Sequence, residues 1–315
     1  MKSNQEDSGK GLRKESLIFA LLILMFILGI FSVLSDQQEV LPDSAAQTIK
    51  PLKDGIAVLY LSGPISFNAN PYIGSSYGVE SFLEQVEDLE DNKHVKALVV
   101  RINSPGGTVG ASQEMYRALL KLKEVSKIPI VASIGDVGAS GAYYTALGSD
   151  VIFANPGSMV GSIGAYIGNI NYSELAKRYG VDFQIYKSGE YKDMLSSWRP
   201  PTQKEKEILQ QMVSNIHQQF VTALIHSRKL PTDNAYMLAQ GQIFTGEQAK
   251  SLKLIDHTGG LREAILFAHQ KAGLKGKPNI INPYNRNIYD LMNFWWGQLE
   301  NRLSVFFRIS PELKW

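Results

Sequence analysis

From residue 55 onward, the apolar positions of the chain follow two periods that alternate along the sequence. Buried β-strands are predicted for short apolar runs at 56–65, 95–102, 128–134, 150–154 and 181–189. Helices are predicted where apolar residues recur at helical spacing, at 79–92, 111–126, 172–180, 203–228 and 261–273, with short helices at 141–149, 234–240 and 246–253. Because strands and helices alternate, we expect an α/β fold with parallel strands and right-handed crossovers.

The most apolar stretch lies ahead of this region. Leu17–Leu34 is an uncharged run of 18 residues, and as a helix it would rise about 27 Å, close to the hydrocarbon thickness of a bilayer. It is longer than the apolar core of a secretory signal peptide, and the residues after it make a poor cleavage site. We therefore expect an uncleaved transmembrane helix at 16–35.

Charges on the two sides of this run predict its orientation. Four basic residues precede it and three acidic residues follow it: Lys2, Lys10, Arg13 and Lys14, then Asp36, Glu39 and Asp43. By the positive-inside rule, the N-terminus lies in the cytoplasm and the rest of the chain on the outer, periplasmic side of the cytoplasmic membrane.

The chain thus divides into five predicted parts. They are a cytoplasmic tail at 1–15, the anchor at 16–35, a polar linker at 36–53, a folded domain at 54–280 and an amphipathic, aromatic segment at 281–315. The last segment could pack on the domain, on another subunit or at the membrane interface. Packing on protein is the simplest interpretation.

Composition excludes several kinds of chemistry. The net charge of +2 gives no broad basic surface for nucleic acid. The chain contains no cysteine, which excludes disulfides, thiolate zinc sites and cysteine nucleophiles. No dinucleotide-binding or phosphate-binding glycine loop occurs in the right context, and there is no HExxH motif. We expect neither a cofactor nor a metal.

Two glycine-rich turns follow predicted strands. The first is Asn103–Gly107, "NSPGG", whose backbone N–H groups could point into a cleft and hold an oxyanion. The second is Gly138–Tyr144, "GASGAYY", where Ser140 could expose its hydroxyl at a strand-to-helix turn. Taken singly, the first turn is more typical of a plain strand-to-helix connection and Ser140 of a helix cap.

A nucleophilic serine needs a base. None of the five histidines (His94, His217, His226, His257 and His269) lies in a sequence context that suggests a triad partner. Lys192, in "YKSGEYKDML", is a better candidate because it lies in a glycine-containing loop after a predicted strand. As a base it must be neutral, which requires its pKa to fall from about 10.4 toward 7. A solvated surface lysine is the alternative, and spacing alone does not decide between them.

Together these segments resemble the short form of the signal peptide peptidase A (protease IV) family, of the Clp-protease/crotonase-like group. The resemblance covers most of residues 55–272 and rests on five motifs in family order: "LVVRINSPGG", "ASIGDVGASGAYY", "ANPGSMVGSIG", "YKSGEYKDML" and "GQIFTGEQAKSLKLIDHTGGL". It implies a repeated β-β-α superhelix after one N-terminal transmembrane helix. The folded domain at 54–280 would then be a serine endopeptidase.

The resemblance also implies roles for single residues. Ser140 falls on the nucleophile, Lys192 on the general base and Ser162 on the hydroxyl that orients the lysine. Gly107 and Gly141 fall on the backbone N–H donors to the oxyanion. It further implies a homo-oligomer whose lysine reaches the serine of a neighbouring copy, and apolar peptides such as residual signal peptides as substrates.

The chain departs from the family pattern at Ala142, Gln242 and Lys253, where many relatives carry Gly, Arg and Gly. Only Ala142 lies beside the nucleophile, where its methyl could alter the fit of a substrate. Two other hypotheses use the same sequence: an acyl-CoA enzyme with this fold and no nucleophile, and a non-catalytic membrane scaffold. The predicted anchor argues against the first, and an incidental Ser/Lys pair would be needed for the second.

Overall fold

The structure is a computed structural model, and it describes residues 53–67 and 78–281. Its strands are β1 (Gly55–Ser62), β2 (Val95–Ser104), β3 (Ile130–Ala139), β4 (Val151–Ala154), β5 (Met159–Gly161), β6 (Ile243–Thr245), β7 (His257–Thr258) and β8 (Ile280–Ile281). Its helices are α2 (Val79–Glu90), α3 (Val109–Ser126), α4 (Gly141–Ala146), α5 (Ser173–Arg178), α6 (Gln203–Arg228), α7 (Thr232–Leu238), α8 (Gly246–Ser251) and α9 (Leu261–Lys271).

One sheet joins all eight strands. Its main path runs β6-β5-β3-β2-β1-β8, and β4 and β7 branch from it, with β4 paired to β3. Every pairing is parallel except that between β5 and β6. The branch arises because the first half of β3 pairs with β4 and its last three residues, Val137–Ala139, pair with β5. The predicted α/β fold with parallel strands is confirmed.

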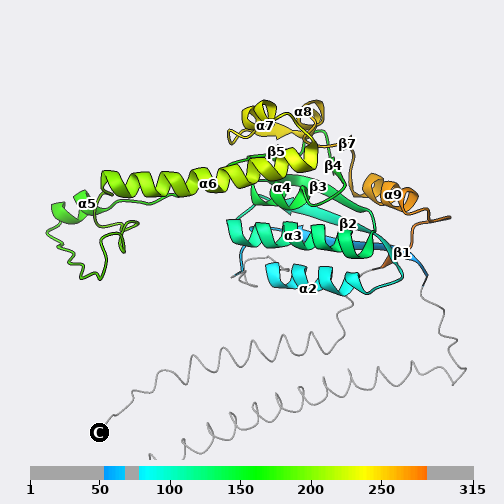
Figure 1. The fold of residues 1–315 in the computed structure, drawn as a ribbon, viewed down its shortest axis with the longest axis horizontal. Coiled ribbons are helices and arrows are strands. Elements are labelled where there is room, and N and C mark those ends of the chain that lie inside the picture. Colours follow the sequence, from blue (N-terminus) through cyan, green and yellow to red (C-terminus); the bar gives the residue numbers. More distant parts are fainter. Residues whose placement is uncertain (1–52, 68–77, 282–315) are drawn as a thin grey trace, which may run out of the picture. The chain divides into compact units, whose positions relative to one another are not determined.

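Side chains on the two faces of the sheet belong to two separate cores. Alternate residues of β1 divide between them, because neighbouring side chains of a strand point to opposite faces. Leu59 packs in the larger core with α2, α3, α4 and α6, while Val58 packs in the smaller core under α9. Figure 1 shows α2 and α3 on one side of the strands and α9 on the other. Because helices pack on both faces of the sheet, they hold in place the strands whose ends carry the candidate site.

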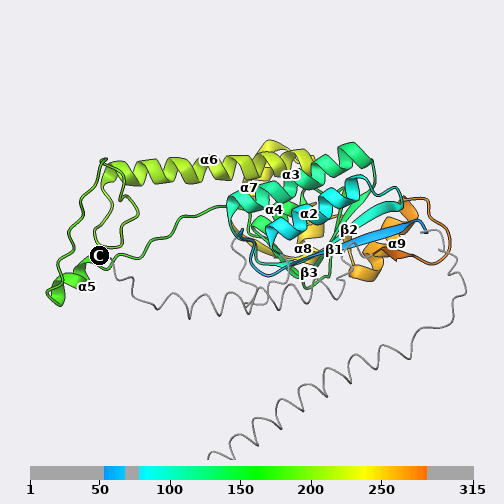
Figure 2. The same ribbon diagram turned by 90° about the horizontal axis from the view of Figure 1, so that it is seen from below.

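Helix α6 links this core to a projecting segment, residues 168–202, which we call the arm. The last turns of α6 are buried at Phe220, Val221 and Leu224, whereas most of its first half is exposed. Figures 1 and 2 both show the arm, with α5, at the end of α6 that lies away from the sheet. A capping box between Thr202 and Glu205 begins α6 where the arm ends.

Predictions about the arm and about the ends of the chain have different outcomes. The strand predicted at 181–189 is wrong: this segment has no regular secondary structure, because no strand of the described residues pairs with it. Among the helices of residues 53–67 and 78–281, none is long and apolar enough to cross a membrane. The anchor predicted at 16–35, the tail at 1–15, most of the linker and nearly all of the segment at 281–315 lie outside the described residues.

Candidate active site

The site is built where β2 and β3 end side by side. The side-chain oxygen of Asn103 accepts hydrogen bonds from the N–H groups of Asp136 and Val137, both at 3.0 Å. Ser104, which is fully buried, accepts a hydrogen bond from the N–H of Gly106 at 3.1 Å. The "NSPGG" turn is therefore fixed both to itself and to the neighbouring strand.

Ser140 lies at a sharp turn between β3 and α4. Its backbone has φ 52° and ψ −126°, a region that residues other than glycine seldom occupy and that often marks a functional turn. Its N–H donates to the carbonyl of Gly161 at 2.8 Å. Its hydroxyl makes no capping hydrogen bond to α4. The half-buried side chain thus remains free to face the two cavities that it lines.

The helix after Ser140 is held by its two tyrosines. Tyr143 is fully buried, and its hydroxyl donates to the carbonyl of Leu254 at 2.6 Å. Burial raises the pKa of Tyr143 above its ordinary value, so that this hydroxyl stays protonated. The half-buried Tyr144 makes edge-to-face contacts with Tyr116 and Phe220. Both residues pack α4 in place.

Gly107 and Gly141 bring two backbone N–H groups together. A Cβ on Gly141 would lie 3.3 Å from the nitrogen of Gly107, and a Cβ on Gly106 would lie 2.6 Å from the nitrogen of Gly141. Gly106 also has φ +92°, which favours glycine. Within the described part of the chain, neither N–H of Gly107 or Gly141 has a hydrogen-bond acceptor. Two adjacent, unpaired donors are what an oxyanion hole requires.

Ser162 lies beside Ser140 through the strand register. Ala139 pairs with Gly161, so the two serines follow paired positions of parallel strands. Ser162 also has a positive φ, 49°, and its N–H donates to the carbonyl of Gln242 at 2.6 Å. Both serines line a cavity of about 420 Å³. A second, adjoining cavity of about 280 Å³ is shared by Ser140, Gly107 and Gly141.

His217 is a residue that sequence reasoning missed. It lines the cavity of Ser140 and Ser162, and its Nε2 lies 2.6 Å from the carbonyl oxygen of Ala239. The helical spacing of Val213, Ser214 and His217 on α6 was the available signal, because it places them on one face of the helix. Nothing in the sequence showed that this face lines the same cavity as Ser140.

Lys192 does not join the other candidates within the chain. It is exposed on the arm, and no residue of the arm lines either cavity at Ser140. Its side-chain amine has no hydrogen-bond or ion-pair partner among residues 53–67 and 78–281. The chain therefore holds the candidate nucleophile and the candidate base on different parts of the molecule.

The comparisons with known proteins agree with this arrangement of motifs. The pattern of peptidase family S49 matches residues 123–275. A candidate protease of Synechocystis sp. is 42% identical over 195 residues, which cover 62% of this chain and 69% of that protein. The chain belongs to peptidase family S49. It is a serine peptidase.

This S49 peptidase is also similar to a second relative and to a solved structure. A candidate signal peptide peptidase SppA of Enterococcus faecium is 35% identical over 197 residues, or 62% of this chain and 57% of that one. Among solved structures, a point mutant of ClpP1 from Listeria monocytogenes aligns with a TM-score of 0.45 and 13% identity, over 66% of this chain and 94% of that one.

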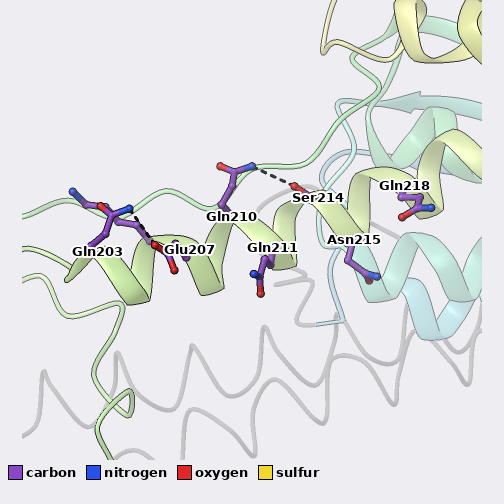
Figure 3. A pocket seen from close by; sticks show the side chains of 8 residues that line it. Gln203, Glu207, Gln210, Gln211, Ser214, Asn215 and Gln218 are labelled. Carbon is purple, nitrogen blue, oxygen red and sulfur yellow. Dashed lines mark hydrogen bonds between the residues drawn. The ribbon is translucent and has the colours of Figure 1, made fainter.

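The S49 peptidase has another hollow, on the exposed face of α6, which we do not assign to catalysis. Figure 3 shows the polar side chains along it, with Gln203 donating to Glu207 at 3.4 Å and Gln210 donating to Ser214 at 3.5 Å. Its lining contains none of the five predicted site residues. Among the described residues, no three His, Asp or Glu side chains form a group that could hold a metal ion.

Proposed function

We propose that this chain is a membrane-anchored serine endopeptidase with a Ser140/Lys192 dyad. The observation that carries the proposal is the turn at Ser140, with its free hydroxyl beside two unpaired N–H groups. A strained strand-to-helix turn exposes a nucleophile in the same way in other hydrolases. The motif order of the family assigns the role of base to Lys192. The proposal also includes the repeated β-β-α superhelix that the resemblance implies for the domain.

The reaction proceeds through an acyl-enzyme. The neutral amine of Lys192 takes the proton of the Ser140 hydroxyl, and the oxygen forms a bond to the peptide carbonyl carbon. The Gly107 and Gly141 N–H groups stabilise the oxyanion. The lysinium then gives its proton to the leaving amine as the C–N bond breaks. Lys192 next takes a proton from water, whose oxygen bonds to the ester carbonyl carbon. As the ester C–O bond breaks, the lysinium returns its proton to the Ser140 oxygen. Ser162 accepts or donates a hydrogen bond that orients the amine.

The dyad in this proposal forms between copies of the chain. Lys192 is absent from the cavities that Ser140 lines. The arm that carries it exposes an unusual number of large apolar side chains, more than a third of each: Ile170, Tyr172, Leu175, Tyr179, Val181, Phe183, Ile185, Tyr186, Tyr191, Leu195 and Trp198. Such a surface is typical of a protein interface. A homo-oligomer would bury it and bring Lys192 to the Ser140 of a neighbour.

Apolar peptides are the substrate class that suits the cavity beside Ser140. Its wall includes Tyr144, Met212, Ile216 and Phe220, and such a wall favours an apolar side chain next to the scissile bond. The name of the Enterococcus relative and the predicted anchor favour residual signal peptides. The catalytic domain would then lie on the outer side of the cytoplasmic membrane, tethered by the helix at 16–35.

A subunit-mixing experiment tests the dyad and its location. Purified Ser140→Ala and Lys192→Ala proteins should each lose peptidase activity against an apolar reporter peptide. When the two are dissociated, mixed in equal amounts and reassembled, about one quarter of wild-type activity should return, because a quarter of neighbouring pairs combine an intact serine with an intact lysine.

The controls separate the possible failures. A chain carrying both substitutions should stay inactive alone, and each single variant reassembled with itself should also stay inactive. Full activity of the pure Lys192→Ala protein would exclude lysine as the base. Activity lost in both variants and not restored by mixing would place the dyad within one chain.

A further inference from the structure

The loop that carries Lys192 is tied to the arm by short-range backbone contacts. Within residues 187–199, the N–H of Lys192 donates to Gly189 at 3.2 Å and that of Ser196 donates to Asp193 at 2.8 Å. These bonds form turns and do not connect the loop to the sheet. The N–H of Tyr172 also donates to the carbonyl of Ser197 at 2.6 Å, which holds the loop to the rest of the arm. The contacts that connect the loop to α6 come from side chains.

Asp193, the residue after Lys192, is the centre of an ion-pair network. Its carboxylate accepts a hydrogen bond from Lys187 Nζ at 2.7 Å. It also accepts two from Arg199, from Nε and Nη2, both at 2.8 Å. The two-pronged contact with a planar guanidinium fixes direction as well as distance. The side chain of Asp193 is only 11% exposed, although most of the loop around it is open to solvent.

Arg199 connects this loop to α6. Its Nη1 donates to Glu205 Oε2 at 2.8 Å, and its Nη2 donates to the other oxygen of the same carboxylate. Glu205 is 1% exposed and belongs to the capping box, where its Oε2 accepts the N–H of Thr202 at 2.7 Å. Because α6 continues into the buried core, the chain of contacts runs from Lys192's neighbour to the body of the protein.

The charges of this network balance and stay ionised near neutral pH. Hydrogen bonds from Arg199, and then from Lys187, hold the pKa of Asp193 well below its ordinary value. Hydrogen bonds from Arg199 and Thr202 lower the pKa of Glu205 to about 2. The two carboxylates therefore face Lys187 and Arg199, and the amine of Lys192 has no counter-ion within the described part of the chain.

We infer that Asp193, Arg199 and Glu205 are positioning residues that present Lys192 to the catalytic serine and keep Asp193 from pairing with it. The inference rests on the proposed role of Lys192 as the base. The charged groups of the loop and of the element that it contacts are Lys187, Glu190, Asp193 and Arg199 from the loop and Glu205 from α6. Of these, Asp193 is adjacent in sequence and is neutralised by the network.

Release of Asp193 would act on Lys192 in two ways. The loop would lose its attachment to α6, and the amine would no longer be held at the correct distance from the serine. A displacement of about 1 Å between reacting groups can lower the rate on the order of 100-fold. A freed carboxylate would also stabilise the charged form of the amine. Since the base must be neutral, the acid limb of the pH–rate profile would move to higher pH.

A mutant cycle with the full chain separates these effects. Arg199→Gln removes two of the three hydrogen bonds that the Asp193 carboxylate accepts from cations and leaves Lys187 as its ion-pair partner. It should lower kcat by about 10- to 100-fold, leave KM within about twofold, and raise the acid limb of kcat/KM by up to about one pH unit. In the double variant Asp193→Asn/Arg199→Gln, kcat should stay low, but the acid limb should return to its wild-type position because the anion is gone. KM should change little because the arm lines neither cavity at Ser140.

Glu174→Gln is the matched control. It breaks the exposed pair between Glu174 and Lys177 on the same arm, and it should leave kcat, KM and the pH profile unchanged. Oligomer mass and thermal midpoint are measured for every variant. The inference is overturned if Arg199→Gln has the wild-type kcat and acid limb. It is also overturned if its activity falls only in proportion to lost assembly.

Lys192→Ala, assayed alongside, distinguishes failure of this inference from failure of the proposed function. If Lys192→Ala is as active as wild type, the proposed base is wrong and the positioning role falls with it. If Lys192→Ala is inactive while Arg199→Gln behaves as wild type, the base assignment stands and only the positioning role is wrong.

Discussion

The core and the arm of this S49 peptidase have similar sequence patterns and opposite environments. Val99 of β2 is fully buried because β1 and β3 pair with β2 on its two sides and α9 covers this face of the sheet. Phe183 lies in a segment that was also predicted to be a strand, yet it is 51% exposed, and no strand of the described residues pairs with its segment. A strand-like sequence becomes a strand only where another strand is beside it. The core supplies its own partners, and the arm of a single chain does not.

The largest expected effect comes from a cavity in the core. Leu119→Ala in α3 removes a fully buried side chain from the larger core, and it should lower the free energy of unfolding by about 2–5 kcal/mol. Leu175→Ala removes the same atoms from α5 on the arm, where Leu175 is 54% exposed. Its effect on core unfolding should stay within about 0.5 kcal/mol.

Denaturant unfolding, followed by far-UV circular dichroism, measures both changes. The slope of the unfolding free energy against denaturant concentration should be the same in the two variants, so that their unfolding midpoints can be compared directly. Equal destabilisation by Leu119→Ala and Leu175→Ala would mean that the arm folds as part of the core, and the contrast between the two regions would be lost.

A smaller effect is expected from the apolar surface of the arm. Phe183→Ser removes an aromatic ring that stacks on Trp198 at 5.1 Å between ring centroids and is half exposed. If a neighbouring copy covers this surface, the dissociation constant of the oligomer should rise at least about tenfold, since aromatic anchors carry much of the energy of interfaces. Core unfolding should hardly change.

Analytical ultracentrifugation over a dilution series measures the dissociation constant. Leu266→Ser in α9 is the matched control, because Leu266 is 49% exposed but lies on the core. Wild-type association of the Phe183→Ser protein, or equal weakening by Leu266→Ser, would show that the arm is not the interface.

The contrast between core and arm also explains which elements could be predicted from sequence. The strand at 95–102 and the helices at 79–92 and 203–228 appear close to their predicted bounds, because their patterns are satisfied by neighbours within the chain. The strand predicted at 128–134 is also present, but as β3 it continues to Ala139. The strand at 181–189 was predicted by the same rule and is wrong. Strand formation depends on a distant partner, which a local pattern does not contain.

The candidate site divides in a similar way. Motifs alone predicted the turns at Asn103–Gly107 and Ser140, because glycine and proline specify turn geometry locally. The pairing of Ala139 with Gly161, which sets Ser162 beside Ser140, is a matter of strand register. His217 reaches the same cavity only through the packing of α6. Neither fact is encoded in a short stretch of sequence.

The smallest expected effect is a loosening of the arm in acid. The pKa of Glu205 is lowered from 4.5 to about 2, and that of Asp193 is also lowered, chiefly by Arg199. Groups with a depressed pKa in the folded state stabilise it above their unfolded pKa, and this contribution disappears as the pH falls through the folded value. The arm's ion pairs should therefore be intact above about pH 4.5 and weaken progressively toward about pH 2.

Hydrogen exchange followed by mass spectrometry, corrected for the intrinsic pH dependence of exchange, can test this. Peptides from 187–199 should lose protection between about pH 5 and pH 2.5, while peptides from β2 and β3 should keep theirs. Glu205→Gln should show reduced protection already at neutral pH and a weaker dependence on acid, since one of the two titrating carboxylates is absent. Parallel loss of protection in the arm and in β2 would instead indicate acid unfolding of the whole domain, in which case the two regions would not be independent in the way their burial suggests.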